Sequence, residues 1–174
     1  MQVKILKDSK QLGMEAAVFC AKVINKAIEE KGKARIVLST GASQFDTISA
    51  LIEQNIDWSK VEMFHLDEYV DLPETHPASF RKYLKERFVS KINLKKAWFV
   101  IGEGDINKNI AELTEEIRKE PIDIGLIGIG ENAHIAFNDP PADFDTREAY
   151  KVVNLDDNCK KQQTGEGWFA TVND

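Results

Sequence analysis

Polar side chains suited to acid–base chemistry follow an apolar run near residue 125. Residues 122–129 are apolar apart from Asp123 and two glycines, a pattern typical of a strand buried on both faces of a sheet. The residues that follow bring carboxylates, an amide and an imidazole: Glu131, Asn132, His134 and Asp139. An imidazole can exchange a proton with a substrate oxygen, and a neighbouring carboxylate can orient it. An ordinary polar loop has the same composition, so this stretch alone favours neither interpretation.

A second acidic group, Asp67 and Glu68, follows a predicted strand at 61–66. A carboxylate held beside a small substrate can take a proton from a carbon next to a carbonyl group. His65 alternates with Asp67, so both face the same side if the chain stays extended. The plainer interpretation is that these acids are solvated or cap the next segment.

A third polar stretch lies between a predicted strand and a predicted helix. It consists of two serines, a threonine, a glycine and an alanine: Ser39, Thr40, Gly41, Ala42 and Ser43. Hydroxyl groups beside the free N–H groups of a helix N-terminus favour binding of an anion, most readily phosphate. The stretch has neither the spacing of a Walker loop nor a GxGxxG fingerprint. Capping of the helix by Ser43 is the structural alternative.

Alternating strands and helices predict how these stretches are positioned. We expect strands at 3–6, 34–38, 61–66, 97–100, 122–127 and 150–153, and helices at 9–30, around 45–52, 79–89 and 106–118. Ser9 is the expected cap of the first helix, whose apolar face carries Leu12, Ala16, Phe19, Val23 and Ala27. This order is typical of a single α/β domain, doubly wound and Rossmann-like, with a mostly parallel sheet and helices on both faces. In such a sheet the three polar stretches share one crevice.

Composition excludes several functional classes. The net charge is −6 and no basic patch is evident, which argues against nucleic-acid binding. No apolar run approaches membrane-spanning length and no leader is evident, so we expect a cytoplasmic protein. The two cysteines, Cys20 and Cys159, are far apart and indicate free thiols in a reducing compartment. No tight spacing of metal ligands is present, so no metal is expected.

Together the three stretches resemble the glucosamine-6-phosphate deaminase (isomerase) family. They read STGAS at 39–43, HLDEYVDLPETHPASF at 65–80 and GIGENAHIAFNDP at 128–140, in the family's order and spacing. The resemblance covers nearly the whole chain. It favours the deaminase branch over the related 6-phosphogluconolactonases, whose last motif continues differently after the histidine. It implies conversion of D-glucosamine 6-phosphate to fructose 6-phosphate and ammonia without an organic cofactor, and a possible homo-oligomer.

The resemblance also implies roles for individual residues. Asp67 is similar to the base that moves a proton between C2 and C1, and His134 to the acid/base that opens the sugar ring. Asn132 stands where members have Asp or Asn that supports ring opening. Asp139 stands where many members have Glu and is shorter by one methylene. Residues 39–43 would hold the phosphate, and Lys160 and Lys161 lie near another basic contact of some members.

Two alternatives to this function stay open at the level of sequence. One is isomerisation of another amino sugar phosphate, such as galactosamine 6-phosphate. The other is a sugar-phosphate-binding module without turnover. Family members continue with further strand–helix units and a phosphate-binding lysine, so we expect residues 1–174 to lack part of the phosphate site. For the same reason, Trp168 and Phe169 are expected to have no following element to pack on.

Overall fold

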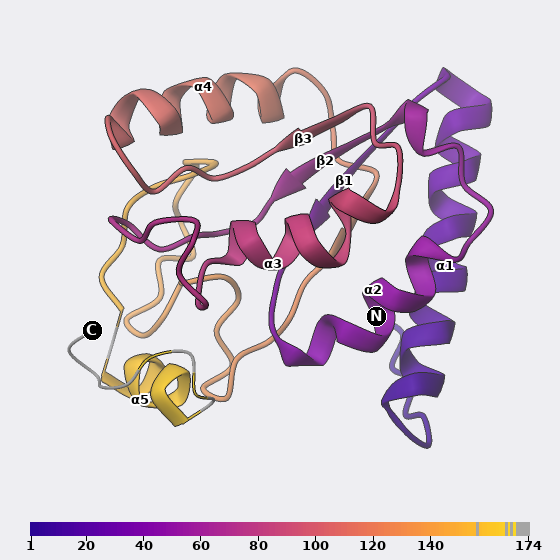
Figure 1. Ribbon diagram of the computed structural model, residues 1–174. Helices are drawn as coiled ribbons and strands as arrows, with labels where there is room; N and C mark the ends of the chain where they lie inside the picture. Colours follow the sequence, from indigo (N-terminus) through magenta and orange to yellow (C-terminus); the bar gives the residue numbers. More distant parts are fainter. Residues whose placement is uncertain (156, 166, 168, 170–174) are drawn as a thin grey trace.

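A computed structural model describes residues 1–155, 157–165, 167 and 169. Four parallel strands form one sheet in the order β3-β2-β1-β4 (Figure 1). The strands are β1 (Ala34–Leu38), β2 (Val61–His65), β3 (Lys96–Trp98) and β4 (Ile124–Leu126). The helices are α1 (Ser9–Lys31), α2 (Phe45–Ile52), α3 (Phe80–Arg87), α4 (Ile106–Arg118) and α5 (Asp157–Gly165), with short 3-10 turns at Ala42–Gln44, Trp58–Lys60 and Val89–Lys91.

Helices cover both faces of the sheet, as predicted. Alternate residues of a strand point to opposite faces, so Ile36 and Met63 enter a core formed with α1, α2 and α3. Val37 and Phe64 enter a second core, in which Leu113 of α4 packs from the other side (Figure 1). Helix α4 covers this second face because it belongs to the connection from β3 to β4, and that crossover places β4 beside β1.

Two predicted strands are absent from the described part of the chain. Residues 3–6 form no strand and the side chain of Ile5 is 93% exposed. Residues 150–153 form no strand either. A strand is stabilised by hydrogen bonds to a neighbouring strand, and neither segment is paired with the four-stranded sheet. The prediction that 122–129 is buried on both faces is also wrong, because β4 is a three-residue edge strand with Gly125 exposed.

The buried face of α1 differs from the predicted one. Small residues dominate the buried positions: Gly13, Ala17, Cys20, Ala21, Ile24 and Ala27. Leu12 and Phe19 are 45% and 61% exposed instead. The reason is close packing against α2, since a Cβ atom at Gly13 would lie 2.6 Å from the backbone carbon of Asp46. Bulky side chains do not fit there, so they take the solvent side.

The ends of α1 are set by its flanking residues. Asp8, rather than Ser9, is the N-cap, and its carboxylate accepts a 2.8 Å hydrogen bond from the backbone N–H of Gln11. Gly32 ends the helix in a left-handed conformation, which glycine adopts without strain. Cys20 is a free, buried cysteine, and burial raises the pKa of its thiol to about 11. The side chain of Cys159 lies outside the described residues.

The region after α5 is described only in part. Trp168 lies outside the described residues. The ring of Phe169 packs on an earlier part of the chain, because it contacts Tyr69 edge-on, with centroids 5.0 Å apart, and stacks on His76. These contacts join the C-terminal residues to the segment that follows β2. The expectation that Phe169 has no following element to pack on stays a prediction.

Arg35 links β1 to the C-terminal end of α4. Its side chain is 3% exposed and donates to the backbone carbonyls of Glu116 at 2.6 Å and Ile117 at 3.1 Å, and also to that of Glu120. The last carbonyls of a helix have no partner within the helix. A buried guanidinium group therefore satisfies the end of α4 and fixes this helix on the sheet.

We predict that Arg35→Met lowers the free energy of unfolding by about 2–4 kcal/mol, because it leaves several carbonyls without a donor. Urea denaturation followed by circular dichroism measures this loss. Lys119→Met is the matched control, since Lys119 lies at the same helix end but its side chain is exposed and, among the described residues, pairs with Glu116 alone. The control should unfold at the same urea concentration as the wild type. Equal losses in both variants would contradict the assigned role of Arg35.

Candidate active site

The three polar stretches meet in one cavity, as predicted. Its volume is about 280 Å³. Residues 39–43 after β1, Asp67 after β2, and residues 128–131 with His134 after β4 line it. The cavity therefore lies at the carboxyl ends of three neighbouring parallel strands. It is also at the point where the strand order reverses, because β1 has β2 on one side and β4 on the other.

Asp67 is half-buried at the end of β2 and faces this cavity. Among the described residues, its carboxylate has no hydrogen-bond partner or ion pair. Burial raises the pKa of Asp67 to about 7, and the neighbouring charge of Glu68 adds to the increase. A carboxyl group with a pKa near 7 is suited to act as a general base at neutral pH.

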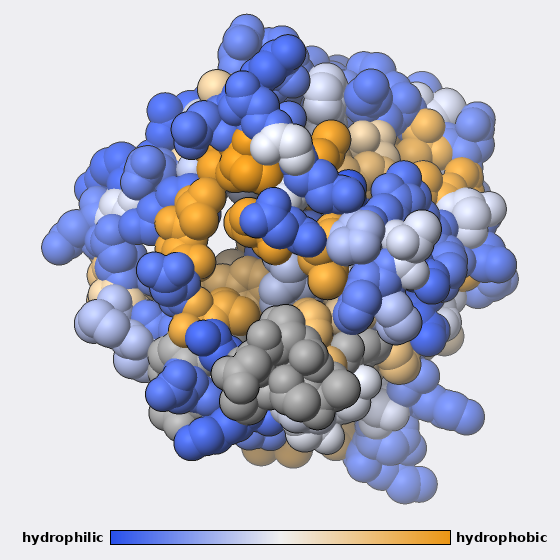
Figure 2. Space-filling view, turned by 60° about the vertical axis from the view of Figure 1, so that its left-hand side comes forward, coloured by the Kyte–Doolittle hydropathy of each residue, from blue (hydrophilic) through white to orange (hydrophobic). Residues whose placement is uncertain are grey.

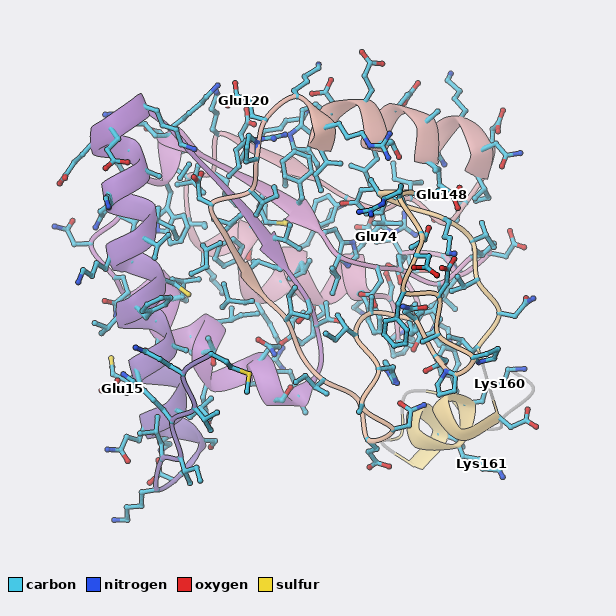
Figure 3. All side chains as sticks on the ribbon, turned by 180° about the vertical axis from the view of Figure 1, so that it is seen from behind. Glu15, Glu74, Glu120, Glu148, Lys160 and Lys161 are labelled. Atoms are coloured by element: carbon cyan, nitrogen blue, oxygen red, sulfur yellow. The ribbon has the colours of Figure 1, made fainter. Side chains whose placement is uncertain are left out.

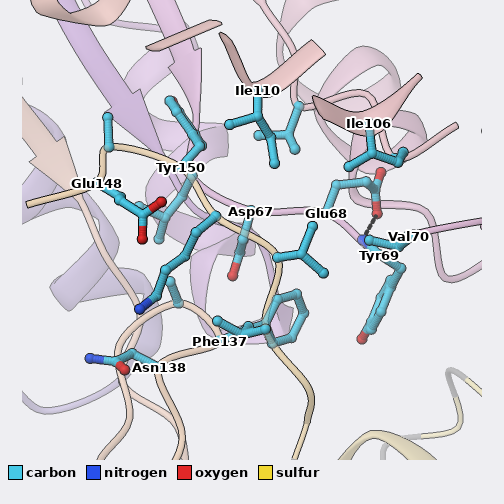
Figure 4. A pocket seen from close by; sticks show the side chains of 18 of the residues that line it. Asp67, Glu68, Tyr69, Val70, Ile106, Ile110, Phe137, Asn138, Glu148 and Tyr150 are labelled. Atoms are coloured by element: carbon cyan, nitrogen blue, oxygen red, sulfur yellow. Dashed lines mark hydrogen bonds between the residues drawn. The ribbon is translucent and has the colours of Figure 1, made fainter. Parts of the chain in front are cut away.

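Glu68 has a structural role, although it is adjacent to Asp67. Its buried carboxylate accepts hydrogen bonds from the backbone N–H groups of Phe80 at 3.2 Å and Arg81 at 2.8 Å. It also accepts from the backbone N–H of Tyr69, shown as a dashed line in Figure 4. Glu68 thus occupies the N-terminus of α3 and closes the loop that begins at Asp67. The plainer interpretation, that an acid of this pair caps the next segment, is therefore confirmed for Glu68 but not for Asp67.

Arg81 has a structural role that the sequence did not reveal. It is 5% exposed and lies 3.4 Å from the Glu68 carboxylate. It also pairs with Glu103 at 2.6 Å and donates to the carbonyl of Leu72 at 3.1 Å. The loop from Asp67 to α3 is thereby attached to the segment after β3. No local pattern indicates this role, because the partners lie 9 to 22 residues away.

His134, Asp139 and Asn132 form a compact group. The Nδ1 atom of His134 lies 2.9 Å from a carboxylate oxygen of Asp139 and also contacts the amide oxygen of Asn132. Both partners are acceptors, so the hydrogen of a neutral imidazole resides on Nδ1 and the lone pair on Nε2. The shorter carboxylate of Asp139 reaches the ring, and the three residues that the sequence predicted do come together.

Gly130 makes room for the ring of His134. A Cβ atom at this position would lie 2.2 Å from Cε1 and 2.5 Å from Nε2 of the imidazole. The backbone turns around the same point, with the N–H of Gly130 donating to the carbonyl of His134 at 2.9 Å. Any side chain at 130 would displace the imidazole. The sequence showed this glycine only as a loop residue.

The stretch 39–43 is held in place from both sides. The hydroxyl of Ser39 accepts a 3.0 Å hydrogen bond from the backbone N–H of Gly128, which ties the ends of β1 and β4 together. The hydroxyl of Tyr83 donates to the carbonyl of Gly41 at 3.0 Å. Ser43 is exposed and its side chain does not cap α2. Its hydroxyl and that of Thr40 line the cavity at the start of the helix.

Lys160 and Lys161 are not brought to this cavity. Both are exposed on α5, where Figure 3 labels them. Neither lines the cavity walls. Their predicted contact with the phosphate therefore stays a prediction. Among the described residues, no three His, Cys, Asp or Glu side chains gather as a metal site requires. Within the same residues, no helix has both the length and the apolar character needed to cross a membrane.

A second, larger cavity adjoins the first. Its volume is about 510 Å³, and mostly apolar residues of the segments after β2 and β3, of α4 and of the chain 146–155 line it. It opens on the face shown in Figure 2, where apolar side chains surround a hollow. Four residues line both cavities: Leu66, Asp67, Ala136 and Phe137. Asp67 therefore lies in the wall between a polar and an apolar space.

His65 lies in the core beneath this wall. It is fully buried and, among the described residues, neither ring nitrogen has a hydrogen-bond partner. Burial, together with the charge of Arg81, lowers the pKa of His65 to about 3. The ring is therefore neutral at physiological pH. His65 was predicted to face the same side as Asp67. It lines neither of the two cavities, whereas Asp67 lines both, so the two side chains do not share a space for substrate.

Comparison with known proteins agrees with this arrangement. A curated glucosamine-6-phosphate deaminase of Shewanella halifaxensis is 33% identical over 95% of this chain and 66% of its own length. One of Staphylococcus epidermidis is 35% identical over 88% of this chain and 65% of its own length. The chain thus spans about two thirds of the length of these relatives.

Solved structures show the same fold. A monomeric glucosamine-6-phosphate deaminase of the NagB superfamily superposes with a TM-score of 0.85 and 26% identity, over 99% of this chain and 72% of the other. A 6-phosphogluconolactonase of Thermotoga maritima gives a TM-score of 0.69 at 23% identity, over 76% and 62% of the two chains, which is a likeness of fold.

The profile of one protein family, described as glucosamine-6-phosphate isomerases/6-phosphogluconolactonase, matches residues 7–164. This match covers all three polar stretches and the sheet that brings them together. The deaminases and lactonases among the similar proteins are enzymes. In open parallel sheets ligands bind at the carboxyl ends of the strands, and this cavity lies there. The chain belongs to the glucosamine-6-phosphate isomerase/6-phosphogluconolactonase family.

Proposed function

We propose that this protein deaminates and isomerises D-glucosamine 6-phosphate, giving D-fructose 6-phosphate and ammonia. One observation carries the proposal: an Asp67 carboxylate without a partner among the described residues shares a small polar cavity with His134, whose ring is paired with Asp139. The residues from the three strand ends supply a base, a proton-exchanging imidazole and an anion site. The deaminases among the relatives support this choice within the family.

The stretch 39–43 is the proposed phosphate site. Backbone N–H groups at the start of α2 and the hydroxyls of Thr40 and Ser43 supply donors for phosphate oxygens. Anchoring the phosphate at this end places the other end of the sugar beside Asp67 and His134. Proton transfer then becomes effectively intramolecular, since the reacting groups no longer need to find each other.

His134 is the proposed acid/base for ring opening. Its Nε2 atom holds a lone pair, so it can take the proton of the anomeric hydroxyl and return it to the ring oxygen. The bond between C1 and the ring oxygen breaks as the carbonyl at C1 forms. Asp139, which is buried, stabilises the imidazolium ion that exists between the two transfers. Asn132 helps to hold the ring in this orientation.

Asp67 is the proposed base for the next step. It removes the proton from C2 of the open aldose while a proton of the substrate's ammonium group passes to the C1 oxygen, giving an enolamine, and the protonated Asp67 then delivers a proton to C1. The product is an iminium ion at C2. Addition of water to C2 and loss of ammonia then leave the ketone of fructose 6-phosphate. C1 gains a proton as C2 loses one, so C1 is reduced while C2 is oxidised within the same substrate and no external oxidant or reductant is needed.

Ammonia release distinguishes this proposal from its alternatives. The purified chain is incubated with glucosamine 6-phosphate, galactosamine 6-phosphate and 6-phosphogluconolactone, beside the Shewanella halifaxensis relative. Release of ammonia from glucosamine 6-phosphate alone supports the proposal. Preference for galactosamine 6-phosphate, or hydrolysis of the lactone, assigns a different substrate. Binding of glucosamine 6-phosphate without turnover, seen by calorimetry, would indicate a binding module instead.

Asp67→Asn is predicted to abolish isomerisation while sugar-phosphate binding persists. The amide keeps the shape of the side chain but cannot accept a proton from carbon, and loss of a general base costs roughly a hundredfold to ten-thousandfold. Exchange of the C2 hydrogen with solvent deuterium measures the step directly. Asp71→Asn, on an exposed residue of the same loop, is the control and should exchange at the wild-type rate. Wild-type exchange in Asp67→Asn would remove Asp67 from the mechanism.

The raised pKa of Asp67 predicts two pH dependences. Activity requires the carboxylate, so kcat/KM should increase about tenfold per pH unit below pH 7 and level off above it. Stability should change in the opposite sense. The folded state binds the proton more tightly than the unfolded state, so Asp67 lowers the free energy of unfolding as pH rises from about 4 to 7.

Comparison with Asp67→Asn isolates this contribution, because other titrating groups such as His65 are common to both proteins. At pH 8 the variant should be more stable than the wild type by roughly 2–4 kcal/mol, and at pH 4 the two should be alike. Urea denaturation at both pH values provides the measurement. A difference that is the same at pH 4 and pH 8 would mean that Asp67 has an ordinary pKa.

His134→Gln should impair turnover of the cyclic sugar far more than that of an open-chain substrate. The 5-deoxy analogue of glucosamine 6-phosphate lacks the hydroxyl that closes the pyranose ring, so it needs no ring opening. We expect a loss of at least about a hundredfold in kcat/KM on the natural sugar and less than about tenfold on the analogue. Equal losses on both substrates would assign His134 to holding the loop rather than to ring opening.

A further inference from the structure

Tyr150 is fixed beside the proposed base from two directions. Its hydroxyl donates a 2.9 Å hydrogen bond to the backbone carbonyl of His65, two residues before Asp67. Its ring packs against the core that contains Val37 and Phe64, on the α4 side of the sheet. The chain 143–155 therefore crosses the carboxyl end of β2 with one of its side chains anchored there.

Tyr150 and Asp67 face the same space. Both line the larger cavity, which Figure 4 shows from close by. Burial raises the pKa of the Tyr150 hydroxyl, and the charge of Asp67 adds to this increase. A carboxylate has this effect on a phenol when the two lie near each other in a poorly solvated region.

The hydroxyl of Tyr150 is directed to a carbonyl and not to the carboxylate. Asp67 accepts no hydrogen bond among the described residues, so it keeps its lone pairs for a substrate proton. A phenol that donated to Asp67 would stabilise the carboxylate and make it a weaker base. The bond to the His65 carbonyl therefore places an apolar ring beside the carboxylate while its donor group is occupied elsewhere.

We propose that Tyr150 is a positioning residue for Asp67. Its ring shields the carboxylate from water on the side of the larger cavity, and its hydrogen bond to His65 holds the strand end from which Asp67 projects. This inference rests on the proposed role of Asp67 as the base. It assigns to the chain 143–155 a part in tuning the reaction, although that chain lies outside the three polar stretches.

Other charged or titratable groups also face Asp67. Glu68 follows it on the same loop and raises its pKa through charge. The remaining groups line one of the two cavities: Glu131 and His134 in the smaller, and Glu148 and Lys151 in the larger. The part of α4 that lines the larger cavity contributes only Ile106 and Ile110. Substitution of Tyr150 leaves all of these charges in place, so a change in the titration midpoint of Asp67 reports on the Tyr150 ring and its hydrogen bond.

Two substitutions separate the ring from the hydroxyl. Tyr150→Ala opens the carboxylate to water, and the titration midpoint of Asp67 should fall from about 7 toward the ordinary value of about 3.9 by one unit or more, a tenfold or larger change in proton affinity. Tyr150→Phe keeps the ring, so the midpoint should stay within about 0.3 unit. Its kcat/KM should fall about three- to tenfold, because the bond to the strand end is lost. If the alanine variant does not unfold cooperatively, Tyr150→Leu replaces it.

The midpoint is measured in two ways on the whole chain. Carbon-13 NMR of the Asp67 carboxyl, identified by its absence from Asp67→Asn, reports the titration even if the protein proves not to be a deaminase. The acidic limb of the kcat/KM profile reports it during turnover. Tyr83→Phe is the matched control, since it loses a similar bond to the carbonyl of Gly41 on the other face of the sheet. It should raise KM and leave the Asp67 midpoint unchanged.

The outcomes are decisive in either direction. A lower midpoint in the alanine variant with an unchanged one in the phenylalanine variant supports the proposal. An unchanged midpoint in the alanine variant overturns it, because water already reaches the carboxylate. Equal shifts in both variants also overturn it, because the hydroxyl rather than the ring would then control Asp67. Absence of ammonia release with the expected NMR shifts would contradict the proposed function but not the effect of Tyr150 on the titration of Asp67.

Discussion

Pairing of β4 with β1 is the constraint on which the candidate site depends. It joins two segments almost ninety residues apart, and side chains fasten both ends of the pair. At one end the Asp123 carboxylate accepts from the backbone N–H of Arg35 at 2.8 Å. At the other end the Ser39 hydroxyl accepts from the N–H of Gly128 at 3.0 Å. With this register fixed, the anion-binding stretch and the imidazole have to lie on either side of one crevice.

The second constraint is the contrast between two adjacent carboxylates. Glu68 is buried but surrounded by N–H donors and Arg81, so its charge is satisfied and it serves as a cap for α3. Asp67 has no such partners among the described residues, and burial raises its pKa to about 7. Desolvation without hydrogen bonds keeps a carboxylate reactive, whereas desolvation with them makes it structural. The loop therefore places a stable anchor directly beside a reactive group.

Long connections carry the site, and side-chain hydrogen bonds from the rest of the domain hold them in place. Arg35 fixes α4, Arg81 fixes the loop after β2, and Tyr83 fixes the stretch 39–43. Each bond joins segments that lie apart in sequence, so the positions of the catalytic candidates depend on the whole domain. Such preorganisation lowers the cost of arranging groups around a substrate during the reaction.

Sequence alone was sufficient for the fold class, for the crevice and for the residues that meet in it. Apolar runs and helical spacing are local signals, so the bounds of α4 and the strands β1 and β2 followed from them. The predicted strands at 3–6 and 150–153 failed, because a strand exists only where a neighbour offers a ladder of hydrogen bonds. The buried face of α1 failed too, because contact with α2 selects small residues rather than the largest apolar ones.

The different roles of Asp67 and Glu68, and the close approach of Gly130 to His134, were decided by tertiary structure. The roles depend on which donors reach each carboxylate, and the approach depends on the path of a turn. Sequence determined which chemical groups are present and the order in which they appear. Burial, donor geometry and register, which depend on residues far apart in the chain, determined which of those groups remain free to react.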